Sequence, residues 1–305
     1  MRIGTRRSAL ALAQAELIAG LLGDCEIVPM LTRGDRSSEG ASETDDATDK
    51  SRWVSELEDA LRTGEIDLAV HSAKDVPGEL ADGLSLHGAP PRAAAEDVLC
   101  GAGGLDQLRA GARVGTSSIR RLAQLRAVRE DLNVVALRGN VDTRLRKLGD
   151  PSEGLDAIVL ARAGLQRLGR ASEAGHVLDA QRFVPAPGQG VIALEGRSED
   201  TVTRDAVHAI TDKDAFACLL AERALAHALS ASCHTPLGAY AIPAGCGCLQ
   251  LRAWVGLPDG SEWTSDELLG GFYDPEALGQ RVAERLRAAG ASELLQRAKE
   301  MAGSA

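Results

Sequence analysis

The stretch VGTSSIRRLAQLRAVR, residues 114–129, has the pattern of a strand end, a turn of small residues and the first turns of a helix. Ser117 and Ser118 are good N-cap residues, and apolar residues then recur at helical spacing. Arg120 and Arg121 fall in the first turn, where the helix dipole disfavours a cation by ~0.3–1 kcal/mol. Either both side chains point into water, or they hold an anion together with the free N–H groups of the turn.

Further arginines follow other predicted strands. LRGNVDTRL (137–145) places Arg138 after a strand and Arg144 one turn into a helix, and DAIVLARAGLQRLG (156–169) adds Arg167. Ligands collect at the carboxyl ends of parallel strands, so several arginines there predict a cleft for a ligand with several carboxylates or phosphates. The sequence contains neither a P-loop motif nor a dinucleotide-binding glycine motif.

Composition narrows the class of ligand. The 305-residue chain has a net charge of −10 and 3% aromatic residues, which argues against nucleic-acid binding. Residues 109–170 nevertheless hold thirteen basic and six acidic residues, a pattern that favours a small anionic ligand. The sequence predicts neither a transmembrane helix nor a signal peptide, and its six cysteines are too sparse for a secreted scaffold. We therefore expect a cytoplasmic protein that does not bind membranes.

Alternating strand and helix patterns predict an α/β fold with mostly parallel sheets. Buried strands are expected at residues 25–32, 66–71, 132–137 and 157–161. Residues 2–22 faintly repeat the strand–turn–helix pattern of residues 114–129. From residue 212 a buried helix, a β-hairpin and terminal helices predict a smaller α+β domain.

A second polar turn ends the predicted strand in DLAVHSAKDVP, residues 67–77. Lys74 and Asp75 could form a plain surface ion pair, which would contribute little to stability. A carboxylate at the carboxyl end of a strand is also well placed to stabilise a developing cation. Asp75 is therefore a candidate catalytic residue.

The cysteines offer one candidate for chemistry. Cys233 lies on a loop after a predicted helix, where it is either buried and inert or chemically active. Cys246 and Cys248 form a lone CxC without a partner motif, so no metal site is predicted. Residues 37–50 are acidic and rich in small residues, which is typical of a mobile loop that serves as a linker or as a lid.

Together these motifs resemble the porphobilinogen deaminase, or hydroxymethylbilane synthase, family. The similar stretches occur in the family's order: GTRRSALALAQA (4–15), TRGD (32–35), DLAVHSAKDVP, VGTSSIRR, LRGNVDTRL, DAIVLARAGLQRLG, PAPGQG (185–190) and AERAL with SCHTPLGAYA (221–241). The resemblance implies two lobes similar to those of type-II periplasmic binding proteins and a smaller C-terminal domain. The implied limits are 1–92 with 190–210 for the first lobe, 93–189 for the second and 211–305 for the cofactor-attachment domain.

The resemblance also implies an enzyme activity. Such an enzyme adds four porphobilinogen molecules, each losing ammonia, to a covalent dipyrromethane primer and releases hydroxymethylbilane. Cys233 matches the cysteine that carries the primer through a thioether, and Asp75 matches the catalytic aspartate. The residues implied to bind substrate and cofactor are Arg6, Ser8, Lys50, Ser72, Lys74, Thr116, Ser117, Ser118, Arg120, Arg121, Arg138, Gly139, Arg144, Arg167 and Gln189.

Other functions compete with this one. A solute-binding protein would not need a third domain that presents Cys233, and a DNA-binding regulator would need a helix-turn-helix that no segment offers. An inactive or repurposed family member that binds a small polycarboxylate anion is the alternative, because residues 51–53 and 231–232 depart from the family pattern. The family resemblance further implies a monomer whose only partner is its small-molecule substrate.

Overall fold

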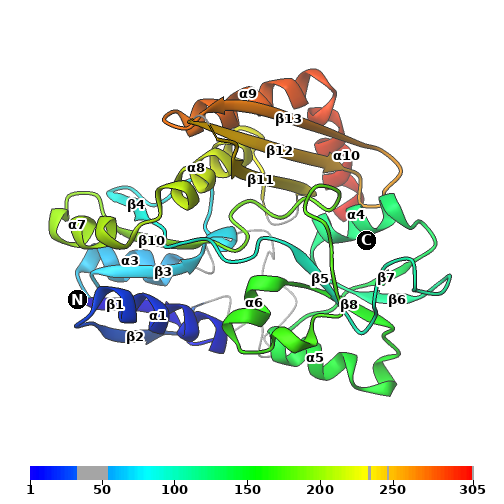
Figure 1. Ribbon diagram of the computed structural model, residues 1–305, viewed down its shortest axis with the longest axis horizontal. Coiled ribbons are helices and arrows are strands. Elements are labelled where there is room, and N and C mark those ends of the chain that lie inside the picture. Colours follow the sequence, from blue (N-terminus) through cyan, green and yellow to red (C-terminus); the bar gives the residue numbers. More distant parts are fainter. Residues whose placement is uncertain (33–53, 233–234, 246, 304–305) are drawn as a thin grey trace.

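The computed structural model describes residues 1–32, 54–232, 235–245 and 247–303, which form two lobes and a C-terminal domain (Figure 1). In this view the C-terminal sheet lies above the region where the two lobes meet. The predicted site residues Lys50 and Cys233 lie outside the described residues. No helix in the described ranges is long and apolar enough to cross a membrane.

The first lobe is built on a five-stranded sheet with the order β2-β1-β3-β10-β4. Its strands are β1 (Arg2–Arg6), β2 (Glu26–Met30), β3 (Leu68–Ser72), β4 (Leu84–Gly88) and β10 (Ile192–Arg197). Its helices are α1 (Ala9–Leu22), α3 (Ser55–Thr63), the 3-10 turn η2 (Ala73–Asp75) and α7 (Thr201–Ile210). Strand β10 runs antiparallel to β3 and β4, whereas β1 is parallel to β2 and β3.

The second lobe repeats this arrangement with the order β7-β6-β8-β5-β9. Its strands are β5 (Asp97–Cys100), β6 (Arg113–Gly115), β7 (Asn133–Val135), β8 (Ala157–Ala161) and β9 (His176–Val177). Its helices are α4 (Ile119–Val128), α5 (Val141–Leu148), η3 (Pro151–Glu153), α6 (Arg162–Arg167) and η4 (Ala171–Glu173). Strand β5 is antiparallel to its neighbours β8 and β9, as β10 is to its neighbours in the first lobe. Each antiparallel strand is the first one formed after the chain crosses between lobes.

The two lobes confirm the predicted α/β class and explain the faint sequence repeat. Strand β1 occupies the same place in its sheet as β6, and each is followed by a helix. The prediction of mostly parallel sheets holds for four of the five strands in each lobe. The exceptions, β5 and β10, return after a crossing segment and enter their sheets in the opposite direction.

The C-terminal domain is an antiparallel sheet, β11-β12-β13, covered by helices. Its elements are α8 (Lys213–Ala228), β11 (Leu237–Pro243), β12 (Cys248–Gly256), β13 (Trp263–Gly271), α9 (Pro275–Ala288) and α10 (Ala291–Gly303). Apolar side chains from the sheet and from α8, α9 and α10 form one continuous core. This confirms the predicted small α+β domain and its hairpin.

Candidate active site

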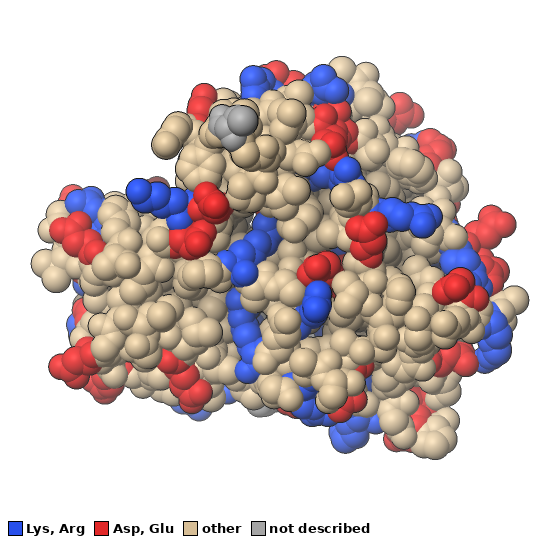
Figure 2. Space-filling view, viewed as in Figure 1, with Lys and Arg blue, Asp and Glu red and all other residues tan. Residues whose placement is uncertain are grey.

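The polar turns predicted from the sequence follow strands of both lobes. Figure 2 shows basic side chains gathered along the hollow between the lobes. The charges of Asp75, Arg121 and Arg144 all act on the Lys74 ammonium, which places groups of both lobes near one another. The site is therefore shared by η2 of the first lobe and by α4 and α5 of the second.

Arg120 and Arg121 are buried, so the interpretation that they point into water is wrong. Their exposed fractions are 4% and 5%. Both bind the carboxylate of Asp97, with Arg120 Nη2 2.8 Å from Oδ2 and Arg121 Nη2 2.7 Å from Oδ1. Arg120 Nη1 donates to the Val184 carbonyl, and Arg121 Nη1 donates to the Val159 carbonyl. In the described structure, the anion beside this helix N-terminus is the protein's own Asp97.

Asp97 is a site residue that sequence reasoning missed. It begins β5, is fully buried, and also accepts a 3.0 Å hydrogen bond from Gln189 Nε2. Burial by itself would raise its pKa, but Arg120 and Arg121 outweigh that effect and lower the pKa to about 2. A charged residue at the start of the otherwise apolar run DVLC was the available signal. The cluster of two guanidiniums and one carboxylate keeps one positive charge.

The turn before α4 uses its hydroxyl groups locally. Ser118 caps the helix by accepting from the Arg121 backbone N–H, as predicted. Thr116 Oγ1 accepts from the Ser118 N–H, and Ser117 Oγ donates to the Leu137 carbonyl at 2.7 Å. These bonds fix the turn so that the side chains of α4 begin at a defined position.

The first lobe places its predicted residues in the same way. Ser8 caps α1 by accepting from the Ala11 N–H at 3.3 Å, and it follows β1, which ends at Arg6. Ser72, the last residue of β3, exchanges two hydrogen bonds with the buried Gln14 of α1, at 2.9 and 3.1 Å. Gln14 is a second positioning residue that the sequence did not single out.

The catalytic candidate Asp75 ends η2 and is partly exposed. The turn is anchored from behind, because the Ala73 N–H donates to the Val191 carbonyl at 3.0 Å. Val191 belongs to the segment that returns from the second lobe to the first, which begins after Val177. The carboxylate of Asp75 therefore sits on a turn that is fixed against the lobe junction.

Three partly buried cations form no salt bridge with a carboxylate among the described residues: Lys74, Arg144 and Arg167. Arg144 Nε donates to the Gly139 carbonyl at 2.8 Å, and Arg167 Nη2 donates to the Gly190 carbonyl at 2.7 Å. Burial lowers the pKa of Lys74 to about 8 and the pKa of both arginines to about 10. Buried cations that form no direct ion pair are costly, so this arrangement favours an anionic ligand.

Arg138 and Gly139 lie on the turn before α5. Arg138 is exposed, and Gly139 has a φ of 117°, which favours glycine. A Cβ at Gly139 would also lie 2.7 Å from Thr143 Cγ2. Glycine therefore lets the chain turn sharply and gives Arg144 its carbonyl acceptor.

Comparison with known proteins identifies the family. A family model described as porphobilinogen deaminase, dipyromethane cofactor binding domain, matches residues 1–205, and one described as the C-terminal domain matches residues 216–288. The chain belongs to the porphobilinogen deaminase family. It is thus an enzyme of tetrapyrrole biosynthesis with a dipyrromethane cofactor, and an inactive anion-binding member is not favoured.

Curated porphobilinogen deaminases match over nearly the whole chain. The protein of Deinococcus radiodurans is 41% identical, with 98% of each chain covered. That of Sorangium cellulosum is 44% identical over 94% of this chain and 98% of the relative. Among solved structures, the methionine-binding protein MetQ is 16% identical, with 69% of this chain and 89% of that chain covered and a TM-score of 0.42.

Proposed function

We propose that this chain is an active hydroxymethylbilane synthase that joins four porphobilinogen molecules head to tail on a covalent dipyrromethane. The observation that carries the proposal is the group of cations, Lys74, Arg144 and Arg167, that lack carboxylate partners in the described structure. Every pyrrole of the substrate and the cofactor carries an acetate and a propionate. A growing chain of such rings supplies carboxylates that can form direct ion pairs with these cations.

The described residues fit the dipyrromethane cofactor. Two rings with two carboxylates each require several cations, and Arg120 and Arg121 add one net positive charge after pairing with Asp97. Arg120 Nε is buried and has no hydrogen-bond acceptor in the described residues. We assign the thioether to Cys233, as the family resemblance implies. When bound, the cofactor supplies the pyrrole carbon to which the first substrate is joined.

Asp75 is proposed as the catalytic residue. Loss of ammonia from porphobilinogen leaves an electron-poor methylenepyrrolenine that carries positive charge. A carboxylate facing the pyrrole N–H stabilises that cation, and it can also take up or return a proton. Ser72 and Ala73 hold the turn of Asp75, through Gln14 and Val191 respectively.

We propose that the basic residues around Asp75 bind the carboxylates of the substrate and the cofactor. Lys74 is next to Asp75 in the chain, and the charges of Asp75 and Arg121 both act on its ammonium, so a substrate carboxylate bound by Lys74 would bring its ring towards the catalytic carboxylate. The negative charge of Asp75 also acts on the Arg144 guanidinium and favours its protonated form. We further infer a monomer that works in the cytoplasm, and sedimentation analysis tests the monomeric state.

The activity is tested by incubating the purified chain with porphobilinogen and measuring released ammonia and linear tetrapyrrole. We expect one ammonia for each porphobilinogen consumed, and we expect Asp75→Asn to release far less at equal protein concentration. Binding of porphobilinogen without ammonia release by the wild-type chain would contradict the proposed function.

A further inference from the structure

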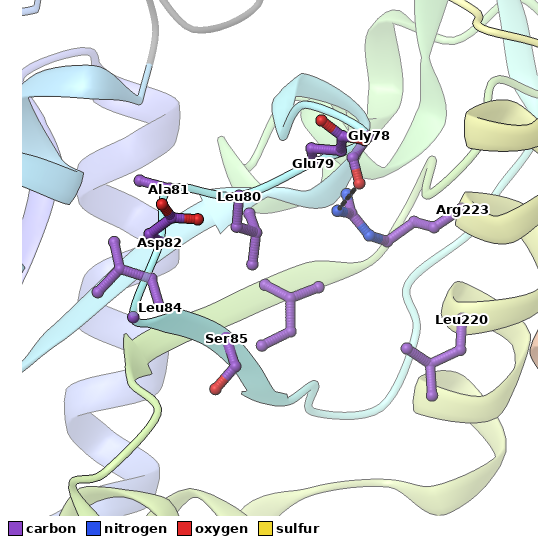
Figure 3. A pocket seen from close by; sticks show the side chains of 11 residues that line it. Gly78, Glu79, Leu80, Ala81, Asp82, Leu84, Ser85, Leu220 and Arg223 are labelled. Atoms are coloured by element: carbon purple, nitrogen blue, oxygen red, sulfur yellow. Dashed lines mark hydrogen bonds between the residues drawn. The ribbon is translucent and has the colours of Figure 1, made fainter.

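The segment that follows Asp75 runs along helix α8 of the C-terminal domain. The two border a pocket of about 540 Å³, lined by residues 78–86 of the first lobe and by Leu220 and Arg223 of α8. Figure 3 shows Arg223 reaching from the helix to Gly78. Arg223 Nη2 donates to the carbonyl oxygens of Pro77 at 2.8 Å and Gly78 at 3.0 Å.

Three side chains of α8, spaced four residues apart, contact this segment. Residues at this spacing share one face of a helix. Leu219 is fully buried and packs in one apolar cluster with Ala73 and Val76. One turn later Arg223 binds the carbonyls of residues 77 and 78, and a further turn places His227 Nε2 2.9 Å from Glu79 Oε1. Consecutive turns of α8 thus follow the chain on both sides of Asp75.

Arg223 is the main polar link in this set. His227 and Glu79 are 56% and 83% exposed, so the contact between their side chains contributes little to stability. Arg223 is partly buried, and burial lowers its pKa while the nearby Glu195 carboxylate opposes the shift. Hydrogen bonds from a guanidinium are about twice as strong as neutral ones.

The preceding residue of α8, Glu222, fixes the helix independently of Arg223. Glu222 is fully buried and accepts from Arg92 Nη1 at 2.6 Å, from the Gly188 N–H at 2.6 Å and from the Ala241 N–H at 2.7 Å. Arg92 and Gly188 belong to the two segments that cross between the lobes. Removing Arg223 therefore leaves the helix docked and frees only the carbonyls of residues 77 and 78, which directly follow the turn of Asp75.

In sequence, α8 leads through residues 229–232 to Cys233, the proposed attachment residue. A chain anchored in the C-terminal domain has to meet Asp75 of the first lobe at every addition. We propose that Arg223 is a positioning residue for chain elongation. It holds the segment next to Asp75 at a fixed position against the C-terminal domain. This inference rests on the proposed function, and it predicts that losing Arg223 slows addition rather than cofactor attachment.

The test compares holoenzymes. Arg223→Met keeps the apolar stem and removes both hydrogen bonds, whereas Arg223→Lys keeps the charge and one donor. Arg285→Met is the matched control, because Arg285 pairs with Asp266 inside the C-terminal domain and makes no contact with residues 73–79. Each protein is mixed with limiting porphobilinogen, and intact mass records how many pyrrole units are added over time.

We expect complete cofactor loading in every variant. Additions to Arg223→Met should be about tenfold to a hundredfold slower, as for misplacement by roughly an ångström. Enzyme that carries only the first added pyrrole units should then accumulate in Arg223→Met. Arg223→Lys should lie between Arg223→Met and the wild type, and Arg285→Met should match the wild type.

Two outcomes would overturn the inference, and they are distinguishable. If Arg223→Met and Arg223→Lys add pyrrole units at the same rate as the wild type, the positioning role alone is overturned. A wild-type chain that carries no pyrrole adduct and adds none overturns the proposed function as well. If Arg223→Met fails to fold, Arg223→Lys provides the test: slower addition of pyrrole units than in the wild type supports the inference, and an equal rate overturns it.

Discussion

Asp97→Asn is the substitution that best tests how the second lobe holds its two arginines. The variant keeps the shape of the side chain but removes the negative charge between Arg120 and Arg121. Because all three groups are buried, water cannot screen the two cations that remain. Removing one partner from a buried ion cluster costs ~3–5 kcal/mol, which exceeds the ~0.5–1.5 kcal/mol of an ordinary hydrogen bond.

The pKa of Asp97 gives a second measure of the same effect. Its carboxyl has a pKa of about 2 against a usual value of 3.8, which corresponds to ~2–3 kcal/mol of stability. Because the folded-state pKa is the lower one, this contribution is complete above pH ~4 and is lost as the pH falls towards 2. The stability difference between wild type and Asp97→Asn should therefore be large at pH 7 and should narrow in acid.

Thermal unfolding of the wild type, Asp97→Asn and the double variant Asp97→Asn/Arg120→Gln provides the assay. We expect the unfolding temperature to fall in Asp97→Asn and to recover partly in the double variant, because one uncompensated cation has been removed. Cofactor loading, measured by intact mass, should fall together with stability. An Asp97→Asn protein as stable as the wild type, or a double variant whose losses simply add, would refute the charge-compensation argument.

Substitutions at three further residues, Asp75, Lys74 and Arg167, test the site itself. Asp75→Asn should lower single-turnover ammonia release by several orders of magnitude and Asp75→Glu by less, because charge matters most; an Asn variant faster than Glu would disprove this. Because the pKa of Lys74 is about 8, kcat/KM should fall above pH ~8 as the ammonium loses its proton. Lys74→Arg should remove that decline, and an unchanged profile would exclude Lys74 as its source. Arg167→Gln should weaken carboxylate binding by ~1.5–3 kcal/mol, seen as a raised KM or incomplete cofactor loading; normal values for both would contradict its role.

Local features were predictable because neighbouring residues determine them. The cap at Ser118 was predicted from a short polar side chain that precedes a helical pattern, and the structure shows that Ser8 and Asn140 cap their helices in the same way. Strand β8 was placed correctly because a continuous apolar run is typical of a strand buried on both faces. Strand β7 is shorter than predicted, since only residues 133–135 pair with β6.

Contacts between distant segments could not be predicted in this way. The conflict at Arg120 and Arg121 was visible in the sequence, but Asp97, which resolves it, lies on β5 more than twenty residues earlier. Nothing local to α8 indicates that Arg223 binds backbone carbonyls near Asp75. Such pairs depend on how the chain crosses between lobes, which helical and strand periodicity do not encode.

Intact mass spectrometry of the purified chain tests the central claim, that this protein builds a tetrapyrrole on a covalent primer. The wild type should be heavier than its sequence by one dipyrromethane, and limiting porphobilinogen should add further pyrrole units one at a time. Cys233→Ser should carry neither the primer nor the added units. A wild-type chain of unmodified mass that gains nothing from porphobilinogen, or a full adduct on Cys233→Ser, would contradict the account.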